Sequence, residues 1–145
     1  MYRKQKYSAC QLIAAINARI FLGEGDVSDA VFEQLVDLAK CRNGAALNVE
    51  ATYKFLGLKS TNGPLNVSWI EKHLPVGITI HSPHYGFHNV LVERVTYTKV
   101  MACVPIFHLV NHEPDNKVTW MEMVRMLPQW DHQQDCRSFE LLPSL

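Results

Sequence analysis

The chain has 145 residues, of which 48% are hydrophobic and 19% charged, as in an ordinary folded domain and unlike a disordered protein. Fourteen basic residues balance fourteen acidic ones, so the charge predicts no general attraction to nucleic acid. No apolar run approaches the ~20 residues that span a bilayer and no signal-peptide pattern follows the basic N-terminal segment, so we expect one cytoplasmic domain, residues 1–145, without a membrane span.

The first part of the chain, from about residue 8 to residue 74, is predicted to be helical. From Ser8 to Leu22 apolar residues recur every three or four positions, and Gly23 follows at a natural helix end. Alanines fill the positions between them, so this helix is expected to be buried on most sides. Three further helices are predicted, one beginning at Asp26 or Ser28, one running from about Leu47 to Leu56, and one near Val67–His73.

The second part, from about residue 76 to residue 142, has the composition of strands, rich in Val, Ile, Leu and aromatic residues. Thr119 and Glu122 form a capping-box pattern that predicts a short helix, Thr119–Leu127. The predicted strands are Val76–His81, Phe87–Tyr97, Ala102–Asn111 and Arg137–Leu142, with a bulge or a sheet edge at Pro105. Helices followed by antiparallel strands predict the α+β class.

Four cysteines are scattered through the sequence and none belongs to a CxxC pair, so we expect free thiols and no structural zinc. Cys10 stands where the first helix is predicted to begin. Unpaired amide groups and the helix dipole at that point would stabilise a thiolate and lower its pKa below the usual ~8.5. The same amides, with Gln5 as a further donor, would stabilise an oxyanion formed on a carbonyl. Taken alone, Cys10 is better interpreted as a small core side chain.

His88 opens an apolar strand, which would hold its imidazole rigidly enough for general-base work or would simply bury it as a core residue. If the strands on either side form a hairpin centred between Lys99 and Val100, His88 lies directly opposite Asn111, with their Cβ atoms about 5 Å apart. The Asn111 oxygen would then accept the imidazole N–H and fix its tautomer, as the third member of a catalytic triad does.

These residues, in this order, resemble the papain-like cysteine peptidase superfamily, and most of all its compact bacterial and phage members of the bacteriocin-processing type. The stretch GFHNVLVERV is similar to that family's G-x-H-x-V-x-V strand. The stretch FHLVNHEPDNKVTWMEMV resembles its strand ending in Asp or Asn, followed by a Pro-containing loop and a short helix with a Trp. SACQLIAAINARIF takes the place of the nucleophile helix, so the resemblance spans Gln5 to Trp130.

The resemblance implies a central N-terminal helix that carries the cysteine and packs on an antiparallel sheet. By the same resemblance Cys10 would be the nucleophile, His88 the base, Asn111 the residue that orients the imidazole, and Gln5 the oxyanion donor. The implied activity is hydrolysis of peptide or amide bonds through an acyl-enzyme, with a peptide or protein as the partner and no cofactor.

Three further residues are expected to contact the substrate: Gln11, directly after the cysteine, and His84 and Tyr85, in the turn before His88. In the family a Gly usually follows the cysteine, and the Gln donor stands one residue further from it than Gln5 does. These two differences favour an alternative, a papain-like binding module that has lost catalysis. An unrestrained protease would threaten its own cell, so we expect narrow specificity or a target outside that cell, such as one in a host cell.

A third interpretation is a histidine-rich metal-binding protein. It rests on the H-x2-H-x3-H pattern of His81, His84 and His88, with His108 and His112 near the same strand end. The first three histidines flank a turn and do not share one helix face, so no metal site is predicted.

Overall fold

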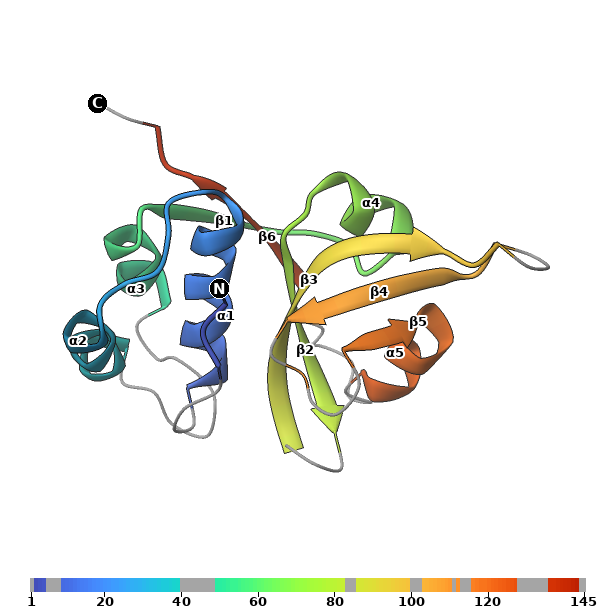
Figure 1. Ribbon diagram of the computed structural model, residues 1–145, viewed down its shortest axis with the longest axis horizontal. Helices are drawn as coiled ribbons and strands as arrows, with labels where there is room; N and C mark the ends of the chain where they lie inside the picture. The colour runs from blue at the N-terminus through green and yellow to red at the C-terminus, as the bar shows by residue number, and fades with distance from the viewer. Residues whose placement is uncertain are drawn as a thin grey trace.

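The computed structural model of the chain describes residues 2–4, 9–39, 49–82, 86–99, 103–110, 112, 116–127 and 136–143. Over these ranges the fold is mixed α+β, with five helices and a six-stranded antiparallel sheet, which confirms the predicted class (Figure 1). The helices are α1 (Cys10–Phe21), α2 (Asp29–Ala39), α3 (Val49–Phe55), α4 (Val67–Lys72) and α5 (Trp120–Met126). The strands are β1 (Leu58–Asn62), β2 (Val76–Ser82), β3 (Gly86–Tyr97), β4 (Pro105–Val110), β5 (Lys117–Thr119) and β6 (Cys136–Leu141).

The strands lie in the order β1-β6-β2-β3-β4-β5, so β6 is inserted between β1 and β2. Helix α1 packs mainly on β3, with α2 and α3 on its outer side, whereas α5 packs against β2, β4 and β5. Figure 1 shows the group α1–α3 and the helix α5 on opposite sides of the sheet. The buried hydrophobic residues accordingly form two clusters, one beneath each group of helices.

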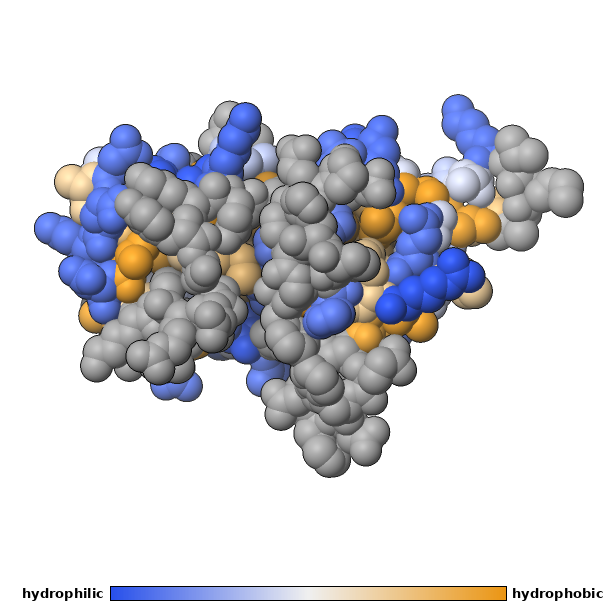
Figure 2. Space-filling view, turned by 90° about the horizontal axis from the view of Figure 1, so that it is seen from below, coloured by the Kyte–Doolittle hydropathy of each residue, from blue (hydrophilic) through white to orange (hydrophobic). Residues whose placement is uncertain are grey.

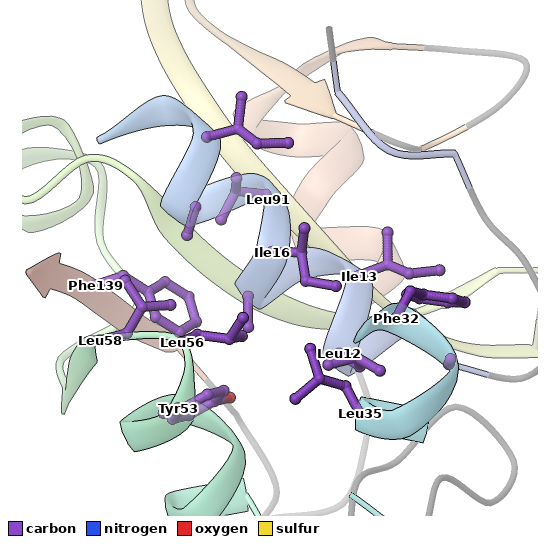
Figure 3. Packing of buried hydrophobic residues seen from close by; sticks show 14 of the residues in the cluster. Leu12, Ile13, Ile16, Phe32, Leu35, Tyr53, Leu56, Leu58, Leu91 and Phe139 are labelled. Atoms are coloured by element: carbon purple, nitrogen blue, oxygen red, sulfur yellow. The ribbon is translucent and has the colours of Figure 1, made fainter. Parts of the chain in front are cut away.

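The first cluster is built around α1. Nine of the 12 residues of this helix are buried, which confirms the prediction that it is covered on most sides. Leu12, Ile13 and Ile16 lie between α2 and the sheet, near Phe32 of α2 and Leu91 of β3 (Figure 3). A helix buried to this extent has little freedom to move relative to β3, because protein cores are close-packed.

The second cluster lies under α4 and α5, where Ile70 and Met123 are fully buried. The predicted capping box at the start of α5 is confirmed, because Thr119 and Glu122 each bond the other's backbone N–H. The outer side of α5 exposes Met121, and orange hydrophobic residues reach the surface on that side of the molecule in the view from below (Figure 2). None of the described helices is long and apolar enough to cross a membrane.

The N-terminal residues 2–4 are tied to α1 and β3. The Arg3 backbone N–H donates to Asn17 Oδ1 at 2.7 Å, and the Asn17 amide donates to the Arg3 carbonyl at 3.0 Å. The Arg3 side chain donates to Asp26 at 3.0 Å. Burial and a hydrogen bond to Glu93 raise the pKa of Tyr2 above its ordinary value. The segment is therefore fixed along the helix that carries the cysteine.

Two of the strands, β1 and β5, were not predicted from the sequence. β1 is mostly polar and β5 has only three residues, so neither shows the apolar run or the regular alternation that predicts a strand. Pro105 is the first residue of β4, where it pairs with Tyr97 of β3 and lies outside the pairing with β5, so of the two predicted alternatives it fits an open edge and not the bulge. Its missing N–H is tolerated at that position, since the first residue of a strand can lack a ladder bond.

The register of the β3–β4 hairpin also differs from the prediction. Leu91 pairs with Val110, a register two residues away from the one that would place His88 opposite Asn111. The difference arises because the connection is centred later in the chain, where the Thr98 N–H donates to the Val104 carbonyl. The extra β3 residue that bulges out between Val92 and Arg94 shifts the pairing back by one residue and so offsets part of the difference. The predicted centre of the hairpin, between Lys99 and Val100, is therefore wrong, and Asn111, the proposed partner of His88, lies outside the described residues.

Candidate active site

Cys10 is the first residue of α1, and its side chain is 4% exposed. The residue before it, Ala9, caps the helix without any side-chain hydrogen bond, so the first-turn amides depend on other acceptors. The Cys10 sulfur benefits from these amides, since the backbone N–H groups of Cys10 and Gln11 both act to lower the pKa of its thiol. The predicted position of the cysteine at a helix start is confirmed.

A third amide reaches the same sulfur from the sheet. The Asn89 backbone N–H donates to Cys10 Sγ at 3.3 Å. In an antiparallel sheet such an N–H normally donates to a neighbouring strand. Because the sulfur takes the place of that acceptor, the thiol lies against the backbone of β3, just beyond the first described pair of β3 and β4, Leu91 with Val110.

His88 is the residue directly before this donor. It is buried, at 2% exposed, and pairs with Ile80 of β2. Its ring stacks on that of His112, with 5.8 Å between the ring centroids and 28° between the planes. The structure thus brings the Cys10 thiol to the β3 backbone one residue from His88, whose imidazole lies on the Ile80 face of the sheet and stacks on that of His112, beyond the end of β4.

Burial raises the pKa of the Cys10 thiol above its ordinary value, although hydrogen bonds from the amides of Asn89, Gln11 and Cys10 act in the opposite direction. The sequence-based prediction of a lowered pKa is therefore wrong, because it counted the helix amides and not the loss of water around a nearly covered sulfur. At neutral pH the thiol carries its proton, and any nucleophilic role needs a base that removes it.

Comparison of the chain with protein-family models, with curated proteins and with solved structures gave no match.

Several residues of the predicted site fall outside the described part of the chain: Gln5, His84, Tyr85 and Asn111. Their predicted roles stay predictions. Gln11 is described, as the second residue of α1, and is partly buried. Its backbone amide serves the thiol, so the residue contributes to the site whatever its side chain contacts.

No three of the histidines that the structure describes gather around one point. His81 is exposed and pairs with Phe87, whereas His88 pairs with Ile80, so strand alternation places the two imidazoles on opposite faces of the sheet. His108 contacts Thr96 Oγ1 through Nε2 at 2.7 Å. Among the residues that the structure describes, no three His, Cys, Asp or Glu side chains are grouped so that they could hold a metal ion.

Asn89 is a site residue that the sequence patterns do not single out. Its side chain donates to Thr79 Oγ1 at 3.1 Å on β2, and its Oδ1 lies over Gly77. These contacts anchor β3 to β2 at the residue whose N–H meets the thiol. The sequence feature that could have indicated Asn89 is its polar side chain inside the apolar run GFHNVLV, directly after the histidine.

A second buried thiol offers a comparison for Cys10. Cys10, Cys103 and Cys136 are free, as predicted, and Cys136 is 3% exposed. Its sulfur donates to the Pro64 carbonyl at 3.8 Å, whereas the Cys10 sulfur accepts from amides. The two thiols therefore have equal burial and opposite hydrogen-bonding roles.

Proposed function

We propose that this chain is a papain-like cysteine hydrolase that cleaves peptide or amide bonds, with Cys10 as nucleophile and His88 as base. The observation that carries the proposal is the 3.3 Å hydrogen bond from the Asn89 N–H to Cys10 Sγ. It joins the start of the helix to the β3 backbone one residue after His88. A cysteine at the start of a buried helix that packs on an antiparallel sheet is also the arrangement that the sequence resemblance implies.

The proposed reaction begins with proton transfer, because the resting thiol is protonated. The His88 imidazole takes the thiol proton as the sulfur attacks the carbonyl carbon. Negative charge on the carbonyl oxygen is stabilised by first-turn amides of α1, with Gln5 as the predicted additional donor. The imidazolium then gives its proton to the leaving amine, and water attacks the thioester with His88 again as the base. The products are a carboxylic acid and an amine, and the thiol is regenerated.

A second candidate is a papain-like module that binds a peptide without cleaving it. The raised pKa of Cys10 and its 4% exposure favour this alternative, because both make the sulfur a poor nucleophile at rest. The two candidates predict different thiol reactivity in the folded protein.

Alkylation of the folded protein with iodoacetamide at pH 7.5, followed by peptide mapping, tests the catalytic proposal. Cys136 is the matched internal control, since its exposed fraction, 3%, equals that of Cys10 within one percentage point. With an imidazole base nearby, Cys10 should react at least about ten times faster than Cys136. His88→Gln should slow the Cys10 reaction about 100-fold, because a positioned base typically contributes that much.

The control for His88→Gln is His81→Gln, which removes an exposed imidazole on the opposite face of the neighbouring strand. It should leave the Cys10 rate unchanged. Equal rates for Cys10 and Cys136, or a Cys10 rate that does not respond to His88→Gln while the fold is intact, would contradict the catalytic proposal and leave the binding module.

A further inference from the structure

A cavity of about 550 Å³ lies between α3 and the edge of the sheet formed by β1 and β6. Its floor comes from alternate side chains of β1, Leu58, Ser60 and Asn62, which therefore share one face of the strand. Ser60 pairs with Phe139 and Asn62 with Arg137, so these two β6 side chains lie on the same face. Phe139 belongs to the cluster around α1, which places the cavity on the α1–α3 side of the sheet.

Arg137 is held in place on this floor. Its Nη1 donates to the Tyr53 hydroxyl at 3.1 Å, and its guanidinium carbon lies 5.7 Å from the centre of the Tyr53 ring. Tyr53 is fixed in turn by edge-to-face packing on Phe139, with 5.3 Å between ring centroids (Figure 3). An arginine held in this way loses less conformational entropy when it binds an anion than a freely moving one does.

Positive charge exceeds negative charge around the cavity. Its lining contains the cations Lys54, Lys59 and Arg137 and one carboxylate, Glu50. Lys59 also faces Glu140 at 3.7 Å, but both side chains are more than half exposed, so this pair holds neither partner tightly. Arg137 and Lys54 thus carry the positive potential, from the floor and from α3.

The remaining lining gives the cavity an apolar part. Val49, Leu58 and Leu142 line it together with the ring of Tyr53. The volume falls within the range of small-molecule sites and is much larger than a single inorganic ion requires. Hydroxyl and amide groups of Ser60 and Asn62 add hydrogen-bonding partners near the guanidinium.

We propose that this cavity binds an organic oxyanion, a carboxylate or phosphate group attached to a short apolar portion, with Arg137 as its main anchor. The anionic group pairs with Arg137 and Lys54, and the apolar portion packs against Tyr53 and the aliphatic residues. None of these residues is among those placed around Cys10, so the proposal does not depend on the proposed function.

Calorimetric titration of the full chain tests the site with three probes of similar size: benzoate, phenyl phosphate and the neutral benzyl alcohol. We expect saturable binding of at least one of the two anions and none of benzyl alcohol at the same concentrations. The anion that binds more tightly shows whether the site prefers a carboxylate or a phosphate group. Arg137→Gln should weaken that binding about ten- to hundred-fold, and the exposed Lys54→Gln a few-fold.

Arg125→Gln is the matched control, because Arg125 is exposed on α5, on the other side of the sheet. It should bind the anion as the unmodified chain does. Lys54→Gln keeps the test valid if Arg137→Gln disturbs the fold. The site is ruled out if neither anion binds saturably, if benzyl alcohol binds equally well, or if Lys54→Gln and Arg125→Gln have equal effects.

Discussion

Replacing Asn17 by alanine tests the contact that fixes the N-terminal segment to α1. The Asn17 side chain, on a residue with no exposed surface, makes two hydrogen bonds to the backbone of Arg3, at 2.7 and 3.0 Å. Alanine removes both bonds, at a cost of about 1–2 kcal/mol each, while its better helix propensity returns about 0.5 kcal/mol. We expect the free energy of unfolding to fall by about 2–3 kcal/mol, measured by urea unfolding followed by tryptophan fluorescence.

Asn66→Ala is the matched control, because Asn66 is an exposed asparagine whose side chain accepts one hydrogen bond, from the Trp69 N–H at 2.8 Å. Loss of such a helix cap typically costs about 1 kcal/mol. The two variants should therefore differ by at least about 1 kcal/mol. If Asn17→Ala costs no more than Asn66→Ala, the buried pair of hydrogen bonds does not stabilise the fold as argued.

Three other changes have expected outcomes. Gly77→Ala should destabilise the fold by about 1–2 kcal/mol in urea unfolding, because the new Cβ would meet Phe139 Cε2 at 3.2 Å, and a loss near zero would show that Phe139 can shift. Burial and the nearby Arg94 and Lys117 lower the pKa of His108, so stability should fall as pH drops below about 6.5, where the unfolded chain takes up a proton, and His108→Gln should remove that part of the pH dependence. Asn111→Ala should slow Cys10 alkylation roughly ten- to two-hundred-fold with little change in unfolding midpoint, and a loss that follows stability alone would end its role as orienter.

The parts of the fold that the sequence predicts are those with a strong local signal. The apolar spacing of the first helix and the Thr119–Glu122 capping box each specify one structure over a few residues, and both are confirmed. β1 carries no such signal. Its residues are mostly polar, and it is a strand because it pairs with β6. Tertiary contacts decide elements of this kind.

The candidate site is predictable only in part, for a similar reason. The position of Cys10 follows from the helix start, and the strand that carries His88 follows from its apolar run. The hairpin register depends on a longer connection and on the bulge at Glu93, and neither has a sequence signature. The hydrogen bond that joins the thiol to β3 comes from the backbone N–H of Asn89. Because nearly every residue type has such an N–H, the contact cannot be predicted from the residue at this position.

The raised pKa of Cys10 makes the stability of the fold depend on pH. The direction of that dependence distinguishes a raised thiol pKa from a lowered one. A folded-state pKa above the unfolded value of ~8.5 means that the folded chain holds the proton more tightly. The contribution of Cys10 is then constant below about pH 8.5 and is lost as pH rises, with a slope of up to about 1.4 kcal/mol per pH unit, until the folded-state pKa is reached. A lowered pKa would have the opposite effect, a contribution that grows as pH approaches 8.5 from below.

Cys10→Ser isolates this contribution, since serine keeps the shape of the side chain and does not titrate in this range, while all other groups cancel in the difference. Unfolding free energies of the two proteins, measured in urea from pH 6.5 to 10, should differ by a constant amount up to about pH 8.5. Above that pH the advantage of the cysteine should shrink. A difference that instead grows between pH 6.5 and 8.5 would show a stabilised thiolate, and would mean that the amides of Asn89, Gln11 and Cys10 outweigh burial at this sulfur.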